Sequence, residues 1–137
     1  YLASRNEHVN SKIKPELKKG KVVICDRFTD STLAYQVYGK KVKKSFINNI
    51  HKIILQKIKP NLVFILKVNQ KSAQKRLAKR KNKNRYDKFS RSFYNNAQKA
   101  FIKLAKNSKN KYYIYDNSTD DKSLEEKILK VVLSKLK

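Results

Sequence analysis

The feature of this sequence that most constrains its fold is an alternation of short apolar runs with longer amphipathic segments. The runs at 21–25, 61–68 and 111–116 are rich in β-branched and aromatic residues, as strands are. The amphipathic segments have helical periodicity and span residues 2–18, 43–58, 70–80, 90–106 and 122–136. This order predicts an α/β fold with a parallel sheet and helices on both faces. Because no Gly/Ser linker interrupts it, one domain over residues 1–137 is expected.

The helical patterns also predict where helices end and which faces are apolar. Gly20 follows the first helical pattern and is expected to end it, since glycine readily adopts the left-handed conformation of a helix terminus. The helix at 43–58 is expected to carry its apolar residues on one side: Phe46, Ile50, Ile53, Ile54 and Ile58.

The chain is strongly basic, with a formal net charge of +25. Six of its 35 basic residues are arginines, which leaves 29 lysines. A solvated lysine surface accounts for most of this charge, while a nucleic-acid-binding module is the alternative that the charge leaves open. The arginines are the stronger candidates for phosphate recognition, because a guanidinium binds phosphate through two parallel hydrogen bonds.

The remaining composition argues against several classes. A single cysteine, Cys25, offers no disulfide, and the two histidines, His8 and His51, are too far apart to indicate a metal site. No apolar stretch approaches the length of a membrane span, so a cytoplasmic protein is expected. The sequence has no methionine and opens at Tyr1 within a helical pattern, from which we expect a fragment of a longer protein.

Polar residues follow each predicted strand, at the edge where parallel α/β sheets bind ligands. Asp26 and Arg27 follow the first strand, Lys67 and Asn69 the second, and residues 116–118 the third. An aspartate at such a position can hold Mg²⁺ through water, and an adjacent arginine can bind phosphate. The alternative is a local salt bridge that closes the loop.

Three stretches carry a resemblance to a known family. "YLASRNEHVNSKIKPELKKGKVVICDRFTDSTLAYQ" resembles the central segment of thymidylate kinases, including scattered polar positions that helix and strand patterning does not dictate. "KPNLVFILKVN" is similar to the strand that follows in that family. "KRLAKRKNKNRYDKFSRSFYNNAQKAFIKLA" resembles its mobile lid, at about 76–92, and the helix after it.

The resemblance implies a three-layer P-loop nucleoside monophosphate kinase-like fold, of which residues 1–137 form a single partial domain. The Gly-rich phosphate loop is missing, since Gly20 and Gly39 do not lie in a G-x-x-x-x-G-K context. The implied activity is Mg²⁺-dependent transfer of the γ-phosphoryl of ATP to dTMP, giving dTDP, by a cytoplasmic homodimer that binds neither nucleic acid nor membrane. The fragment alone is expected to be inactive, and another nucleotide or nucleoside monophosphate kinase remains the alternative.

In the substrate site, the resemblance implies that Tyr1 stacks on thymine and that Arg5 contacts the monophosphate and base region. It implies that Arg27 grips the phosphate and that Asp26 lies near the metal and the phosphates. Thr32 and Gln36 match positions that face the base edge. Tyr35 matches the tyrosine that crowds the 2′ position of the sugar.

In the lid, Arg76, Arg80 and Arg85 match basic residues that close over the ATP phosphates, and Arg80 and Arg85 are also assigned a catalytic role with Asp26 and Arg27. Structural alternatives stay open for several of these residues. Thr32 can cap a following helix together with Ser31, Tyr35 can be core packing, and Arg76 and Arg80 can belong to a solvated helix face. The sequence also departs from the family by carrying Lys67, Asn69 and Asn84 where acids are common.

Overall fold

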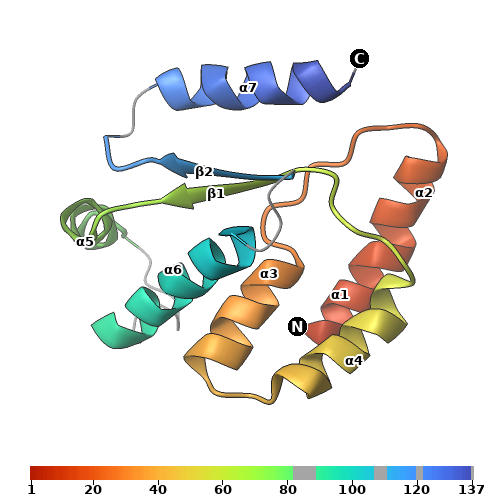
Figure 1. Cartoon of the computed structure of the whole chain (residues 1–137), viewed down its shortest axis with the longest axis horizontal. Coiled ribbons are helices and arrows are strands. Elements are labelled where there is room, and N and C mark those ends of the chain that lie inside the picture. The colour runs from red at the N-terminus through yellow and green to blue at the C-terminus, as the bar shows by residue number, and fades with distance from the viewer. Residues whose placement is uncertain (82–88, 107–110, 120–121, 137) are drawn as a thin grey trace. The chain divides into compact units, whose positions relative to one another are not determined.

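A computed structural model describes residues 1–81, 89–106, 111–119 and 122–136 of the chain (Figure 1). The chain separates into two compact units, Tyr1–Pro60 and Asn61–Lys137. The single domain expected over 1–137 stays a prediction.

The first unit opens with a long helical stretch. It comprises α1 (Leu2–His8), the π-helical segment η1 (Val9–Ile13) and α2 (Lys14–Lys18). Val9 is fully buried and Ile13 is 5% exposed, whereas Leu17 is 43% exposed, so the middle of this stretch faces the core and its end does not. The π segment ends two residues before Pro15, which has no backbone N–H to continue the regular hydrogen-bond ladder.

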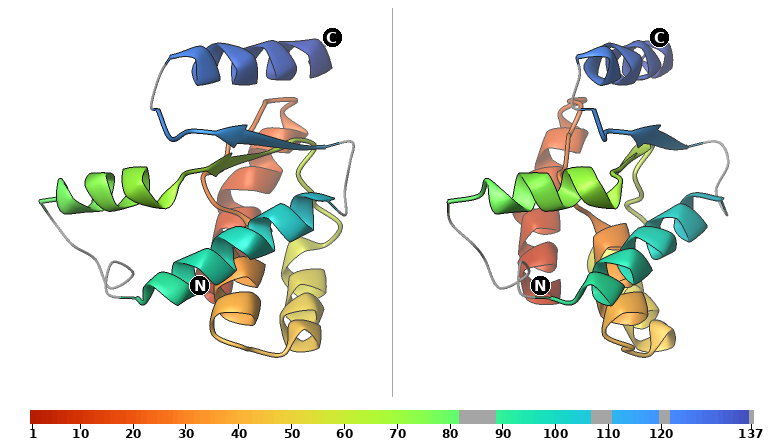
Figure 2. Two further views of the ribbon diagram at one scale, coloured as in Figure 1. Left: turned by 60° about the vertical axis from the view of Figure 1, so that its left-hand side comes forward. Right: turned by 90° about the vertical axis from the view of Figure 1, so that its left-hand side faces the viewer.

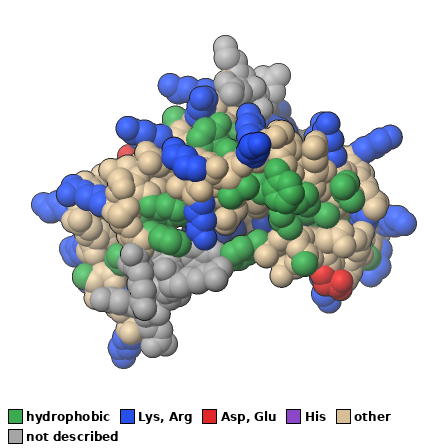
Figure 3. Space-filling model, turned by 90° about the horizontal axis from the view of Figure 1, so that it is seen from below, with side chains coloured by type: hydrophobic (Ala, Val, Ile, Leu, Met, Phe, Trp, Pro, Cys, Tyr) green, Lys and Arg blue, Asp and Glu red, His purple; other side chains and the backbone are tan. Residues whose placement is uncertain are grey.

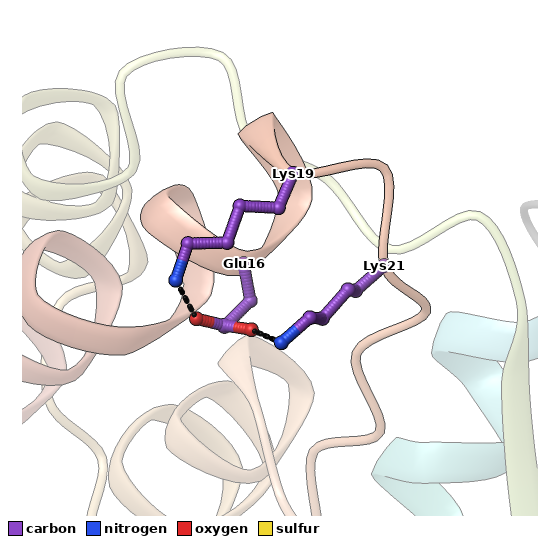
Figure 4. Close-up of polar contacts among 3 residues, drawn as sticks. All are labelled: Glu16, Lys19 and Lys21. Atoms are coloured by element: carbon purple, nitrogen blue, oxygen red, sulfur yellow. Dashed lines mark hydrogen bonds and ion pairs between the residues drawn. The ribbon is translucent and has the colours of Figure 1, made fainter.

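The helical stretch ends at Gly20, as the sequence predicted. Gly20 has a φ of +74°, and its N–H donates to the carbonyl of Leu17 at 3.0 Å while the N–H of Lys21 donates to that of Glu16 at 3.1 Å. This pair of bonds is a Schellman motif. The Glu16 carboxylate adds ion pairs with Lys19 at 2.8 Å and with Lys21 at 2.6 Å (Figure 4). The chain therefore leaves the helix in a fixed direction.

The run at 21–25 was predicted to be a strand, and this prediction is wrong for the structure described. No described strand pairs with these residues. Val22 is 60% exposed and Ile24 is 93% exposed, which rules out the burial expected on both faces. The local sequence favours an extended backbone, but a strand also requires a hydrogen-bonded neighbour.

The remaining regular elements of the first unit are helical. They are α3 (Thr29–Thr32), the π-helical segment η2 (Leu33–Gly39) and α4 (Lys44–Leu55), and α4 packs against both α1 and η2.

The buried face of α4 differs from the predicted one. It consists of Ile47, His51 and Ile54, at helical spacings of four and three. Phe46 is 56% exposed and Ile53 is 72% exposed, so placing them on one inward side was wrong. Apolar residues occur around more than one side of this helix, and contact with α1 and η2 decides which of them are buried.

The second unit contains a parallel two-stranded sheet, which confirms the predicted fold class. Strand β1 (Val63–Lys67) pairs in register with β2 (Tyr112–Asp116). The Phe64 ring stacks with Tyr113 and Tyr115, with centroids 5.5 and 6.3 Å apart.

Three helices accompany this sheet. They are α5 (Gln70–Ala78), α6 (Arg91–Lys106) and α7 (Ser123–Lys135). Helix α6 packs against both strands through a face that buries alanines, and α7 lies on the opposite face of the sheet (Figures 1 and 2). The second unit therefore has the helix–sheet–helix layering expected of a parallel α/β fold.

The packing of α4 predicts a contrast between two alanine substitutions on that helix. Ile47→Ala removes a side chain that is 3% exposed and is expected to lower the free energy of unfolding by about 2–5 kcal/mol. The exposed Lys52→Ala is the control, with an expected change within about 0.5 kcal/mol. Urea unfolding followed by circular dichroism measures both, and equal effects would contradict the assigned face.

Candidate functional site

The candidate site lies where the extended segment 21–25 meets α3, at residues 26–28. Arg27 has a φ of +64°, a left-handed conformation that costs a residue with a side chain about 1–2 kcal/mol. Such strain persists only where surrounding contacts enforce it, and it is concentrated at binding and catalytic sites.

Arg5 supplies those contacts from α1. Its Nη1 donates to the carbonyl of Arg27 and its Nη2 to the carbonyl of Phe28, each at 3.0 Å. The guanidinium also lies over the Phe28 ring, 4.8 Å from the centroid. We call these three contacts the Arg5 clamp. They join two segments more than 20 residues apart in sequence and hold the backbone of the turn.

The surroundings of the Arg5 guanidinium are partly desolvated. Burial lowers the pKa of Arg5, and the nearby Cys25 opposes that shift. The guanidinium remains protonated, because arginine does not lose its proton in proteins. The thiol of Cys25 also lies 3.8 Å from the Arg27 carbonyl, so Cys25 belongs to the wall of the turn.

The side chain of Arg27 is held by η2. Its Nη1 donates to the hydroxyl of Tyr35 at 3.0 Å, and its guanidinium lies 5.5 Å from the centre of the Tyr35 ring. A guanidinium is a planar fork of N–H donors, the shape that binds an anion through two parallel hydrogen bonds. Asp26, directly before Arg27, is exposed. The predicted pair of Asp26 and Arg27 therefore stands at the surface with the arginine oriented by an aromatic partner.

The other predicted residues of this site lie on the neighbouring helices. Tyr1 stands at the start of α1 and is 64% exposed. Gln36 is half-buried within η2, and Thr32 is 7% exposed as the last residue of α3. Ser31 lies inside α3, and Thr32 directly precedes η2 but makes no side-chain cap hydrogen bond, so the alternative that they cap a following helix is wrong. The ligand roles of Tyr1, Thr32 and Gln36 stay predictions.

A second group of polar residues forms at the carboxyl ends of β1 and β2, as the strand-end argument predicted. Lys67 and Asp116 form an ion pair at 3.2 Å, and the N–H of Ser118 donates to Asp116 Oδ1 at 2.9 Å. Hydrogen bonds from Ser118, followed by the hydrogen bond from Lys67, lower the pKa of Asp116. The Ser118 hydroxyl in turn accepts from the N–H of Asn69 at 2.9 Å, which ties the two strand ends together.

The predicted lid arginines have different surroundings. Arg76 donates from Nη2 to the carbonyl of Asn117 at 2.6 Å, so it is anchored at the strand ends. Arg80 follows α5 and is exposed. Arg85 lies outside the described residues, as does part of the predicted lid at 76–92.

The described residues offer limited means of binding a metal. They contain no group of three His, Cys, Asp or Glu side chains that could hold a metal ion. The single carboxylate of Asp26 suits Mg²⁺, which keeps several waters and is often bound through one carboxylate and substrate phosphates. In the ranges that the structure describes, no helix has both the length and the apolarity to cross a membrane.

Lys and Arg side chains are spread over the face that Figure 3 presents. Those of the described residues lie at many separate places on this face instead of gathering in one patch. This distribution agrees with a solvated lysine surface.

Sequence reasoning missed three residues of the site. Phe28 provides the ring beneath Arg5, Cys25 lines the turn, and His51 is buried behind Arg5 on α4. Phe28 and Cys25 flank the Asp-Arg pair in sequence, so their position was a usable signal. His51 occupies the buried face of an isoleucine-rich helix. A polar residue among these isoleucines was the sequence feature that could have identified it.

The fold and this site define an α/β protein with two arginines placed at a turn beyond an extended segment. Comparison with known proteins narrows this class, because the sequence model of the thymidylate kinase family matches residues 1–128. The chain belongs to the thymidylate kinase family.

Individual relatives agree with this assignment. The chain is 46% identical over 107 residues to a thymidylate kinase of Wolbachia sp. subsp. Brugia malayi, covering 77% of this chain and 50% of that protein. It is 33% identical over 139 residues to the thymidylate kinase of Mycoplasma capricolum, covering all of this chain and 65% of that protein. The crystal structure of thymidylate kinase from Ehrlichia chaffeensis matches with a TM-score of 0.73 and 27% identity, over 97% of this chain and 61% of that one. The chain thus spans about half to two thirds of the length of these relatives.

The Arg5 clamp predicts how accessible Cys25 is. Arg5→Lys keeps the positive charge beside the thiol but loses the fork that holds the carbonyls of Arg27 and Phe28. Loss of about one hydrogen bond is expected to raise the rate of Cys25 labelling by a thiol reagent about fivefold. Arg91→Lys, at an exposed arginine of the second unit that bonds Gln70, is the control. Equal labelling rates in all three proteins would show that the clamp does not restrain the turn.

Proposed function

We propose that the full-length protein containing this chain is a thymidylate kinase that transfers the γ-phosphoryl group of ATP to dTMP, giving dTDP and ADP. The observation that carries the proposal is Arg27, held in a left-handed turn by Arg5 and oriented by Tyr35. An arginine fixed in this way can present its donors to a phosphate without reorganising when the ligand binds.

Each predicted substrate-site residue of the first unit has a part in binding dTMP. Arg27 binds the phosphate, and Tyr35 both orients Arg27 and limits the space beside the sugar. The Arg5 guanidinium uses two of its five N–H donors on the turn, so it retains donors for the base region. Tyr1 stacks on the thymine ring, and Thr32 and Gln36 face its edge.

The transfer itself needs no nucleophile from the protein, because the phosphate of dTMP attacks the γ-phosphorus directly. The protein contributes by holding the two phosphates in line and by neutralising charge on the transferred group. In this proposal Arg76, Arg80 and Arg85 supply positive charge to the ATP phosphates. Anchoring of Arg76 on Asn117 supports a fixed position for the first of these cations.

Mg²⁺ and the ATP phosphate loop complete the proposed site. Asp26 holds Mg²⁺ through water, and the ion when bound offsets negative charge on the phosphates of ATP. No G-x-x-x-x-G-K sequence occurs within residues 1–137. We therefore propose that the phosphate loop lies outside these residues, and that the 137-residue chain does not catalyse the reaction alone.

We also propose that the full-length protein acts in the cytoplasm as a homodimer. Support comes from the resemblance to a family whose members are typically homodimeric. The exposed apolar side chains Phe46 and Ile53 on α4 are compatible with burial against a second subunit.

The activity is tested with a coupled assay of ADP formation on the full-length protein. Activity is expected to require dTMP, ATP and Mg²⁺. Arg27→Lys is expected to lower kcat/KM for dTMP about 100-fold, because the substitution removes the planar fork that binds phosphate. Lys52→Ala serves as the control and should retain full activity. The absence of dTMP-dependent ADP formation in the wild-type protein would overturn the proposal.

The base preference separates a thymidylate kinase from other nucleoside monophosphate kinases. Binding of dTMP, dUMP, dCMP, dAMP and dGMP to the full-length protein is compared by isothermal titration calorimetry. We expect dTMP to bind most tightly and the two purine nucleotides at least about tenfold more weakly, since a pocket shaped for a pyrimidine resists the larger rings. If any of the other four nucleotides binds more tightly than dTMP, the substrate proposed here is wrong.

A further inference from the structure

His51 is a buried polar residue to which the proposed reaction gives no role. It lies on the buried face of α4 between Ile47 and Ile54 and is 7% exposed. Its Nε2 atom is buried and has no hydrogen-bond partner among the described residues. Leaving such an atom without a partner is costly, so its surroundings call for an explanation.

Among the described residues, the Nε atom of Arg5 is also buried and without a hydrogen-bond partner. Helices α1 and α4, which carry the two residues, pack against each other. The charge of Arg5 is also felt at His51, where it lowers the pKa of the imidazole. The two atoms are complementary, because arginine Nε can only donate a hydrogen bond and the unprotonated Nε2 of a neutral histidine can accept one.

We propose that neutral His51 is linked to Arg5 Nε through one bridging water, which accepts from Arg5 Nε and donates to His51 Nε2, and that His51 thereby acts as a positioning residue for the Arg5 clamp. In this arrangement Nε2 must be unprotonated and the imidazole proton must lie on Nδ1. With Nη1 and Nη2 bonded to the turn and Nε linked to His51, each of the three guanidinium nitrogens is held by the first unit. Because the clamp sets the conformation of Arg27, His51 influences phosphate binding without touching the ligand. This last step rests on the proposed function.

Protonation of His51 is expected to loosen the clamp. It places a second donor and a second positive charge opposite Arg5. The charged groups that face His51 are Arg5 on α1 and Asp30 on α3, and Asp30 only partly offsets the repulsion. Segment η2, which also packs against α4, contains no Asp, Glu, Lys, Arg or His.

The sign of the pH dependence follows from the direction of the shift. Burial, followed by the charge of Arg5, lowers the pKa of His51 below its ordinary 6.5. The unfolded chain therefore takes up this proton at a higher pH than the folded chain. The contribution of neutral His51 to stability is complete above about pH 6.5 and is lost as the pH falls through the lower pKa of the folded state.

Two variants of the full-length protein separate the hydrogen bond from packing. His51→Gln keeps a side-chain acceptor and does not titrate, whereas His51→Leu keeps the bulk and removes the acceptor. The dissociation constant for dTMP is measured between pH 7.5 and 5.5. Because the phosphate of dTMP itself titrates near pH 6, wild type is compared with His51→Gln at each pH.

At pH 7.5, we expect His51→Gln to bind dTMP within about twofold of wild type and His51→Leu to bind about tenfold more weakly, as loss of a buried hydrogen bond predicts. On acidification, the affinity of wild type should fall more than that of His51→Gln. Parallel pH profiles of these two proteins, or wild-type affinity in His51→Leu, would overturn the proposal.

Nitrogen-15 NMR of the ligand-free protein tests the link independently of the kinase activity. At pH 7.5 the His51 imidazole should carry its proton on Nδ1, and the Arg5 Nε–H should exchange slowly with solvent in wild type and in His51→Gln but rapidly in His51→Leu. A proton on Nε2 at this pH would contradict the link. If the wild-type protein shows these NMR signatures but does not bind dTMP, the proposed function is wrong, whereas the link between His51 and Arg5 still holds.

Discussion

The site depends on the Arg5 guanidinium, which bonds the carbonyls of Arg27 and Phe28 across 22 and 23 residues of sequence. The left-handed backbone of Arg27 is unfavourable by itself, and these bonds oppose its relaxation. Charge-assisted hydrogen bonds are roughly twice as strong as neutral ones, so two of them suffice to offset a strain of this size. Without the clamp, the Asp-Arg pair would be an ordinary surface loop.

The conformation of the turn also depends on the helices that position Arg5. Arg5 is placed by the helical stretch of α1 and η1, whose core contact is the fully buried Val9. From the other side, α4 presents His51 between two buried isoleucines. The Schellman motif at Gly20 directs the chain from α2 toward the turn. Substitutions in these helices are therefore expected to change the affinity for phosphate by shifting the position of Arg27.

Much of this arrangement followed from the sequence, and the exceptions have physical causes. Helical periodicity and strand composition located most elements, including the parallel pair β1 and β2, because these signals are local. The run at 21–25 failed as a strand because pairing depends on a neighbour that local sequence does not specify. On α4 the face predicted from Phe46 and Ile53 failed because apolar residues surround the helix and tertiary contacts choose among them. The Asp26–Arg27 pair is visible in the sequence as a candidate, whereas its support by Arg5 depends on a contact between distant segments.

The most direct test of the account is a double-mutant cycle on dTMP affinity in the full-length protein, with Arg5→Lys, Arg27→Lys and the double variant. If Arg5 acts by presenting Arg27 to the phosphate, most of its effect disappears once Arg27 is replaced. The account predicts a coupling free energy of at least about 1 kcal/mol between the two substitutions. Additive effects, with coupling within about 0.3 kcal/mol, would mean that Arg5 does not act through Arg27 and would contradict the central claim.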